Sequence, residues 1–185
     1  GGKDCSVLVI SGSLNDITLR QIEVAKMHDY PVITLDRKQT QSENYWREND
    51  CGNFIRVVDA SLRAKGIAII ESVDCLGDCK VSLVDDDSDG REEKRLVTAE
   101  NIADMTAKIL KEISPDVLVV FGGDTLVSIV NRLKCSTITP IGEITSGVVV
   151  SKAALPGGEM LLVSKSGGFG GEDTVREIFE YLRKS

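Results

Sequence analysis

Apolar residues in this chain gather into short continuous runs, which are separated by stretches with a helical spacing of apolar residues. A continuous run is typical of a strand buried on both faces, and a spacing of three or four residues is typical of a helix with one buried side. The pattern predicts strands at residues 7–10, 31–35, 67–70, 116–121 and 160–163, and helices near residues 18–28, 54–64, 98–113, 126–133 and 173–183. This alternation predicts an α/β fold, a three-layer sandwich with a mostly parallel sheet between helical layers.

Some segments do not follow the alternation. Residues 36–50 are polar and have no clear period, so we expect a loop there. Residues 85–95 carry so many charges that we expect an excursion into solvent between two elements. Residues 137–164 are rich in β-branched side chains and have turn signals at 146–147 and 156–158, which predicts two or three strands, some of them antiparallel.

Composition and charge limit the classes of function. The 185 residues are 42% hydrophobic and 28% charged, which fits one globular domain. The formal net charge of -7 excludes a broad basic surface, so we expect no nucleic acid as a partner. We expect no membrane partner either, because no apolar stretch reaches the roughly 18 to 20 residues that span a bilayer.

The five cysteines are scattered, and we expect no signal peptide. This usage favours reduced thiols in a cytoplasmic protein. Cys75 and Cys79 are spaced loosely like half of a metal clip, but no second pair accompanies them, so thiols without metal chemistry are the favoured interpretation.

Candidate chemistry lies at three junctions where a predicted strand ends in glycine and a helix follows. In an open α/β sheet, ligands bind at the carboxyl ends of the strands, and free amides at a helix start hold phosphate. The residues that we expect to contact a nucleotide are Gly12 and Ser13 at the first junction, Gly122, Gly123, Asp124 and Thr125 at the second, and Lys165, Ser166, Gly167 and Gly168 at the third. The alternative at each junction is an ordinary turn, with Asp124 as a helix N-cap and residues 18–21 as a capping box.

The third junction is the most specific of the three. Glycines occupy four of five positions, namely 167, 168, 170 and 171. Each glycine costs roughly 0.5 to 1 kcal/mol relative to alanine in regular structure, so a required backbone shape is expected. Lys165 supplies a positive charge for a phosphate, although a flexible turn with a surface lysine is the alternative. The spacing is neither that of a Walker loop nor that of a dinucleotide fingerprint, which disfavours NAD.

The order of these motifs resembles the nucleotide-binding C-terminal domain of the four-carbon acid sugar kinase family. The resemblance rests on Ser11-Gly12-Ser13 with Thr18 and Gln21, on Gly122-Gly123-Asp124-Thr125, on Gly142-Glu143-Ile144 with Gly147, and on Lys165-Ser166-Gly167-Gly168-Phe169-Gly170. It covers nearly the whole chain. The chain departs from the pattern in having Ser146 and Val149 where the family has prolines, and Leu14-Asn15 where it has a small pair.

The resemblance implies ATP-dependent phosphorylation of a threonate- or erythronate-like acid, with ATP and Mg²⁺ as cofactors. It implies that Ser13, the loop from Gly122 to Thr125, and Gly167 contact ATP, and Asp124 is a candidate magnesium ligand. The sugar-acid site and the catalytic base would belong mainly to an N-terminal domain of the same protein. Residues 1–185 would then be the C-terminal half of a two-domain kinase and inactive alone.

No catalytic residue is visible in the chain itself. His28 is the only histidine and lies at a predicted helix end, where it compensates the helix dipole or is simply exposed. Glu143 is a little better explained as structural than as a ligand contact. A non-catalytic nucleotide or phosphometabolite sensor is the alternative function, and a structural domain with glycines kept for tight turns is a third. The oligomeric state is left open, with a homo-oligomer as one option.

Overall fold

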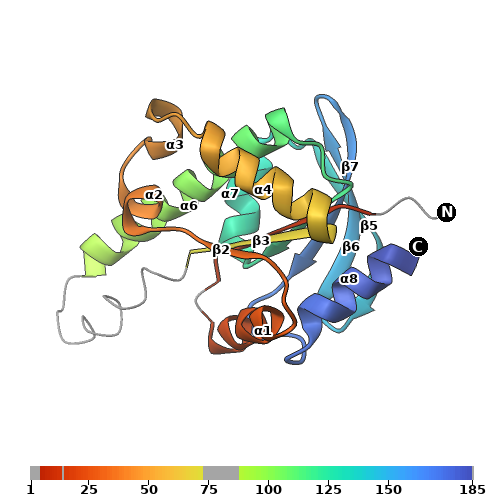
Figure 1. Cartoon of the computed structure of the whole chain (residues 1–185). Coiled ribbons are helices and arrows are strands. Elements are labelled where there is room, and N and C mark those ends of the chain that lie inside the picture. Colours follow the sequence, from red (N-terminus) through yellow and green to blue (C-terminus); the bar gives the residue numbers. More distant parts are fainter. Residues whose placement is uncertain (1–4, 14, 73–87, 185) are drawn as a thin grey trace.

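The computed structural model describes residues 5–13, 15–72 and 88–184, and it has one seven-stranded sheet between two layers of helices (Figure 1). The strand order is β2-β3-β1-β4-β7-β6-β5. Strands β2, β3, β1, β4 and β7 are parallel, and β6 and β5 extend the sheet in antiparallel fashion beyond β7. The predicted fold class is therefore confirmed, including the antiparallel strands near the C-terminus.

The strands are β1 (Val7–Ser11), β2 (Val32–Thr34), β3 (Ile67–Glu71), β4 (Val117–Phe121), β5 (Thr137–Thr145), β6 (Val148–Leu155) and β7 (Gly158–Lys165). The described helices are α1 (Asp16–Met27), α2 (Arg37–Gln41), α3 (Tyr45–Glu48), α4 (Gly52–Lys65), α6 (Ser88–Glu112), α7 (Gly123–Arg132) and α8 (Thr174–Lys184). Within the described part of the chain, no helix combines the length and the hydrophobicity needed to cross a membrane.

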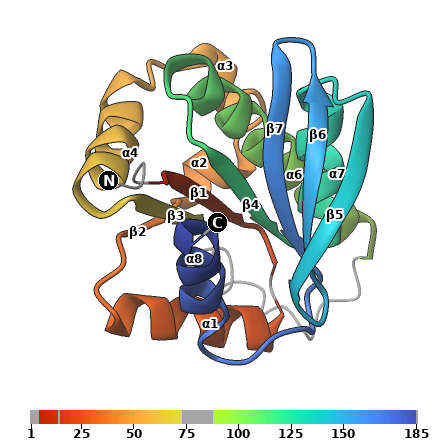
Figure 2. The same ribbon diagram turned by 90° about the vertical axis from the view of Figure 1, so that its right-hand side faces the viewer.

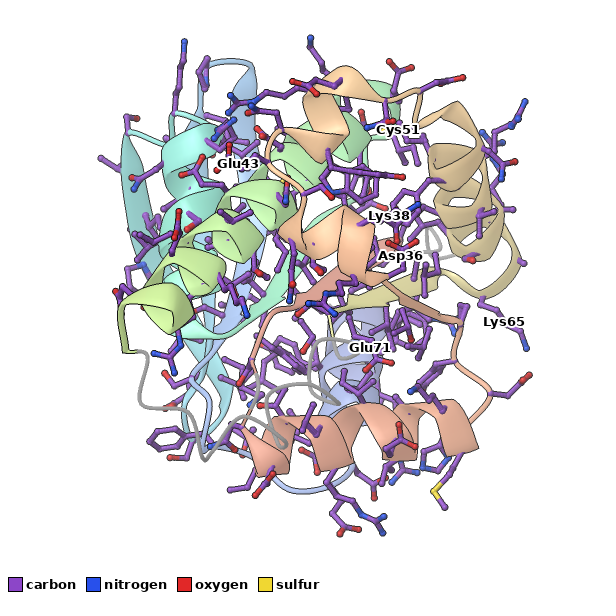
Figure 3. All side chains as sticks on the ribbon, turned by 90° about the vertical axis from the view of Figure 1, so that its left-hand side faces the viewer. Asp36, Lys38, Glu43, Cys51, Lys65 and Glu71 are labelled. Carbon is purple, nitrogen blue, oxygen red and sulfur yellow. The ribbon has the colours of Figure 1, made fainter. Side chains whose placement is uncertain are left out.

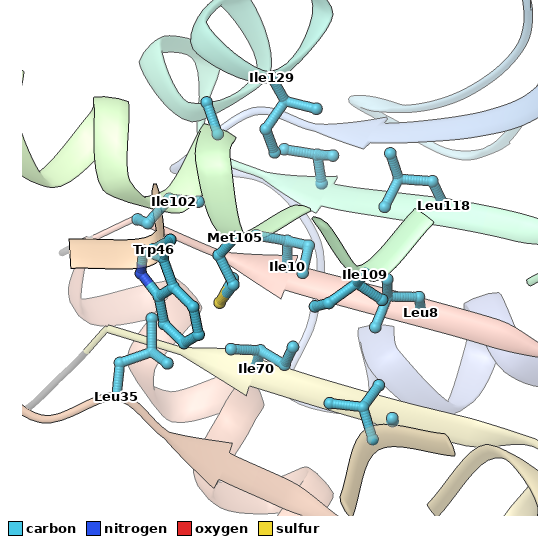
Figure 4. Close-up of a cluster of buried hydrophobic side chains, with 14 of the residues drawn as sticks. Leu8, Ile10, Leu35, Trp46, Ile70, Ile102, Met105, Ile109, Leu118 and Ile129 are labelled. Atoms are coloured by element: carbon cyan, nitrogen blue, oxygen red, sulfur yellow. The ribbon is translucent and has the colours of Figure 1, made fainter. Parts of the chain in front are cut away.

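Alternate side chains of each central strand pack into two separate cores. Leu8 and Ile10 of β1 face the layer formed by α2, α3, α4, α6 and α7, where Met105 of α6 is fully buried (Figure 4). Val7 and Val9 face the opposite layer of α1 and α8, and these two helices lie side by side on one face of the sheet (Figure 2). Because helices cover both faces of the central strands, nearly every residue of these strands is apolar, which explains the continuous apolar runs in the sequence.

The parallel strands end in register at one edge of the sheet. Ser11 of β1 lies opposite Glu71 of β3 on one side and Phe121 of β4 on the other, and Phe121 lies opposite Lys165 of β7. The last residues of four strands therefore form one row, from which the loops to the next elements start together.

Residues 36–50, predicted as a loop, instead contain the short helices α2 and α3. Trp46 is 1% exposed, and its Nε1 donates to the carbonyl of Gln39 at 2.9 Å. The side-chain amide of Asn101 on α6 donates to the carbonyls of Thr40 and Ser42 at 3.0 and 2.8 Å. Contacts with a helix that comes much later in the chain stabilise both helices. The local signal that the prediction missed is the capping box of residues 36–39 at the start of α2.

The charged segment 85–95 was also interpreted wrongly from residue 88 onward. Helix α6 begins at Ser88, ten residues before the predicted start, and residues 85–87 lie outside the described part of the chain. Side chains 92–96 of this first part of α6 are exposed. A helix segment that buries no face shows no apolar period, and its charge alone resembles that of a loop.

Gly66 ends α4 and illustrates a position that requires glycine. Its φ of 73° is left-handed, and its amide donates to the carbonyl of Leu62 at 2.8 Å. A Cβ at this position would lie 3.4 Å from the carbonyl oxygen of Cys5 and from the ring of Phe179. The sequence prediction of a helix stop at Gly66 is confirmed.

We expect Gly66→Ala to lower the free energy of unfolding by about 1–2 kcal/mol, the cost of a left-handed backbone at a residue with a Cβ. Gly157→Ala is the matched control, because a Cβ there meets nothing within 4 Å, and its effect should stay within about 0.5 kcal/mol. Urea unfolding of the two variants measures both values. Equal destabilisation by the two substitutions would contradict the assignment.

Candidate functional site

The three glycine junctions predicted from the sequence meet at the carboxyl edge of the sheet. A Cβ added to Gly12 would lie 2.1 Å from Oγ1 of Thr125, so the first and second junctions are in direct contact. A Cβ on Gly167 would lie 3.6 Å from Oγ of Ser13, so the third junction contacts the first as well. The amide of Gly122 also donates to the carbonyl of Lys165 at 3.1 Å, so all three junctions are in contact and residues distant in sequence form one surface.

The second junction forms an open helix start. Gly122 occupies the N-cap position of α7 with a φ of 109°, and no side chain caps the helix. The first helical hydrogen bond runs from the amide of Leu126 to the carbonyl of Gly122 at 3.0 Å. The amides of Gly123, Asp124 and Thr125 precede this bond, and none of them donates to an atom of the described residues. These donors and the helix dipole together favour an anion at this end of α7.

Asp124 is not the N-cap that one interpretation of the sequence suggested. It is the second residue of α7, and its side chain is exposed in the first turn. Among the described residues, no three His, Cys, Asp or Glu side chains gather into a possible metal-binding group. A cation at Asp124 would therefore need most of its ligands from water or from phosphate oxygens, as Mg²⁺ in nucleotide sites takes them. Cys75 and Cys79 lie outside the described residues.

Lys165 lies beneath the third junction and not on the surface. It is the last residue of β7 and only 2% exposed. Its Nζ is 3.0 Å from Oγ1 of Thr18, and 3.1, 3.3 and 3.3 Å from the carbonyl oxygens of Ser166, Gly167 and Phe169. The ammonium also lies 4.9 Å from the centre of the Phe121 ring. Burial lowers the pKa of Lys165 to about 8.

Two polar residues of α1 hold the same loop. Gln21 is fully buried, and its Nε2 donates to the carbonyls of Phe169 and Gly171 at 3.0 and 2.9 Å and to Oγ1 of Thr174 at 3.2 Å. Thr18, also fully buried, donates to the carbonyl of Gly167 at 3.1 Å. We call Lys165, Thr18 and Gln21 the loop clasp.

The capping-box interpretation of residues 18–21 was wrong. Helix α1 begins at Asp16, and Asn15 caps it by accepting from the amide of Ile17 at 2.9 Å. Thr18 and Gln21 lie on the core-facing side of α1, next to the buried Ile22 and Ala25. A polar residue at a core-facing position requires a buried partner, so these two positions indicate that buried partners exist, although the local sequence does not indicate which residues they are.

The clasp determines which way the loop amides point. In a planar trans peptide the carbonyl and the following amide point in opposite directions. Since the carbonyls of Ser166, Gly167 and Phe169 point toward Lys165, the amides of Gly167, Gly168 and Gly170 point away from it. None of these three amides donates to an atom of the described residues. The loop thus forms a second set of free donors, of the kind that binds anions.

The turn between β5 and β6 supports the loop from the other side. Oε1 of Glu143 accepts from the amide of Gly147 at 2.8 Å, so this carboxylate closes the turn. Gly147 has a φ of 77°, and a Cβ there would lie 2.4 Å from the ring of Phe169. The amide of Ser166 donates to the carbonyl of Gly147 at 3.3 Å. The structural role considered for Glu143 agrees with this geometry.

Glu71 ends the row of strand termini and was not singled out in the sequence. It is 2% exposed, accepts from Oγ1 of Thr34 at 2.8 Å and pairs with Nζ of Lys26 at 2.7 Å, on the side of the sheet that faces α1 (Figure 3). Although burial acts to lower it, hydrogen bonds to Glu23 and Glu71 raise the pKa of Lys26. The Glu71 carboxylate is thus committed to protein partners.

Two further features lie away from the junctions. A cavity of about 560 Å³ opens at the opposite, amino edge of the sheet, between Cys5, Gly66 and Ser114. His28 follows α1, and its Nε2 lies 3.1 Å from Oδ1 of Asp173 on the exposed surface. The free donors gather at the carboxyl edge, where parallel sheets bind their ligands.

The sequence is similar to a family of known proteins. A family model described as the nucleotide-binding C-terminal domain matches residues 8–175. No curated protein matched the sequence.

Three solved structures share the fold. A domain of unknown function from Bordetella bronchiseptica, described with bound citrate and as a domain-swapped dimer, is 17% identical with a TM-score of 0.72, and the match covers 97% of this chain and 41% of that one. A Haemophilus influenzae protein of the same domain type is 23% identical with a TM-score of 0.71, at 97% and 40% coverage. A Salmonella typhimurium LT2 protein is 19% identical with a TM-score of 0.74, at 96% and 41% coverage. The chain thus spans about two fifths of the length of these proteins.

We expect Gly12→Ala to lower the free energy of unfolding by about 1–3 kcal/mol, because its Cβ would overlap Thr125. Gly123→Ala, in the same surface, should be neutral, since a Cβ there meets nothing within 4 Å. In the double variant Gly12→Ala/Thr125→Ala the clash with Oγ1 is gone, so its destabilisation should be smaller than the sum of the two single effects by about 0.5 kcal/mol or more. Chemical unfolding of the four proteins completes the cycle, and strict additivity would argue against contact between the two junctions.

Proposed function

The chain belongs to the family of nucleotide-binding C-terminal domains, and from this we propose that it is the ATP-binding half of a kinase that phosphorylates a four-carbon acid sugar of the threonate or erythronate type. The observation that carries the proposal is the pair of free-amide sets, one at the start of α7 and one in the glycine-rich loop (residues 165–171). Both sets lie next to Gly12 and Ser13 at one edge of the sheet.

The two amide sets suit a polyphosphate better than a single small anion. The start of α7 offers the amides of residues 123–125, and the loop offers those of residues 167, 168 and 170. A chain of net charge -7 repels an anion at long range, so local donors must supply the attraction. Phosphoryl transfer requires chiefly that the protein position the phosphates and stabilise their charge. Fixed backbone amides provide both.

The proposal includes Mg²⁺, with Asp124 as its protein ligand. This carboxylate is exposed in the first turn of α7, beside the free amides. Mg²⁺ in nucleotide sites is commonly held by one or two carboxylates together with phosphate oxygens and water. One carboxylate next to the phosphate donors therefore fits this ion, and the ion would neutralise phosphate charge.

The acceptor acid and the catalytic base belong, in this proposal, to an N-terminal domain of the same cytoplasmic protein. The solved relatives are about two and a half times as long as the region that the chain matches. The Bordetella bronchiseptica relative is described with citrate, a small hydroxy acid, which is in keeping with an acid substrate. Its domain-swapped dimer supports a homo-oligomer as the working assembly.

Calorimetric titration with Mg·ATP and Mg·ADP tests nucleotide binding. A negative charge introduced into the glycine-rich loop tests whether the nucleotide binds there. A Cβ at Gly168 meets nothing within 4 Å, and the same holds for Gly157 in the turn between β6 and β7, at the other edge of the sheet. We expect Gly168→Asp to weaken Mg·ATP binding by about tenfold or more through like-charge repulsion. Gly157→Asp should bind as the wild type does, and both should melt near the wild-type temperature. Equal affinities of the two variants for Mg·ATP would show that the loop is not part of the binding site.

Kinase activity is tested separately by adding an N-terminal acid-sugar domain, either fused or in trans. We expect the chain alone to leave ATP intact, and the reconstituted protein to release ADP in proportion to added threonate or erythronate. A coupled assay for ADP measures the rate, and Asp124→Asn should reduce it at limiting Mg²⁺. ATP binding without turnover in the reconstituted protein would instead favour a nucleotide sensor.

A further inference from the structure

We propose that Lys165 is a positioning residue, whose buried positive charge, together with Thr18 and Gln21, orients the glycine-rich loop so that its amides face the phosphates of the nucleotide. This inference rests on the proposed nucleotide binding and assigns the lysine a place beneath the loop, in contact with no phosphate.

The surroundings of the Lys165 ammonium support this role. It has three hydrogens and four oxygen acceptors within 3.3 Å, three of which are carbonyls of its own loop. Helix α1 presents the neutral Thr18 to it, and β4 presents the ring of Phe121. No carboxylate of the described residues pairs with Nζ. Its charge is therefore balanced by carbonyl dipoles, which keeps those carbonyls turned inward.

Gln21 provides a second, independent observation. Its Oε1 is buried and has no hydrogen-bond partner among the described residues, while the two hydrogens of Nε2 are shared among three acceptors within 3.2 Å, two loop carbonyls and Oγ1 of Thr174. An unpaired buried acceptor is unfavourable. The side chain stays in this orientation because the loop carbonyls occupy its donor end. Both buried groups thus direct most of their hydrogen-bond contacts to carbonyls of the loop.

The pH dependence follows from the pKa of Lys165, which burial lowers to about 8. Below that pH the ammonium has three hydrogens for the four acceptors, and above it the neutral amine has two. Nucleotide affinity should therefore fall as the pH rises through about 8. The contribution of Lys165 to folding has the opposite sign, because between about 8 and the ordinary 10.5 the unfolded chain keeps a proton that the folded chain has lost. Stability from this group rises with pH in that window.

Lys165→Met and Lys152→Met form the matched pair of variants. Lys152 is a half-exposed lysine on β6, 3.9 Å from Glu159, and lies outside the clasp. Calorimetry with Mg·ADP between pH 7 and 9.5 should show Lys165→Met binding about 10- to 100-fold more weakly at pH 7, the size of one or two hydrogen bonds to a charged group. Its profile should be flat across pH 8. Lys152→Met should reproduce the wild-type affinity and its decline.

Chemical rescue separates the charge from the packing of the side chain. Lys165→Ala should regain part of its affinity in the presence of propylammonium, and none with the neutral 1-propanol. In the protein without nucleotide, the amide resonances of Gly167, Gly168 and Gly170 should titrate with a midpoint near the pKa of about 8. A lysine that merely touched phosphate would leave these resonances unchanged in the free protein.

The outcomes distinguish this inference from the proposed function. If the wild type binds Mg·ADP with an affinity that does not change across pH 8, or if Lys165→Met binds as tightly as the wild type, the positioning role is wrong and nucleotide binding stands. If the wild type binds no nucleotide at any pH, the proposed function fails, and the inference fails with it. Should Lys165→Met not fold, the wild-type pH profile and its glycine resonances still decide the question.

Discussion

The glycine-rich loop is held from inside the protein, and the free donors at the candidate site depend on this. Lys165, Thr18 and Gln21 attract four loop carbonyls into the interior. Peptide planarity then turns the amides of the following residues outward. Glycine at position 170 allows the backbone to approach the buried groups, since its φ is 88° and a Cβ there would lie 2.3 Å from Oγ1 of Thr174. Gly170 therefore has a physical reason, whereas a Cβ at Gly168 or Gly171 would meet nothing within 4 Å.

Parallel register brings this loop to the other two junctions. Ser11, Phe121 and Lys165 are paired across neighbouring strands, so β1, β4 and β7 end together. Helices α1 and α8 bury one face of these strands, and α6 and α7 bury the other. The antiparallel strands β5 and β6 add the turn at Gly147, which packs against Phe169. The site is thus built on rigid strands, and the loops themselves need to be only a few residues long.

The sequence was sufficient for the fold and for the position of the junctions, and insufficient for the clasp. Continuous apolar runs such as residues 117–121 are strands because both of their faces are covered. Helix α2 and the first part of α6 were not predicted. Helix α2 is stabilised by a hydrogen bond from Asn101, and the first part of α6 buries no side. The loop partners of Thr18 and Gln21 lie about 150 residues later in the chain, where no local period can show them. The nucleotide contacts themselves stay predictions.

A buried lysine suits this acidic chain better than a surface one. A surface ammonium keeps its water and its many rotamers, and both must be lost when a phosphate binds. Lys165 loses them when the protein folds, and the desolvation appears as its lowered pKa. Its charge then acts through amides that are already oriented, so less ordering is left for the ligand to bring about. Placing the cation below the loop also leaves the space above the amides for the anion of the proposed function.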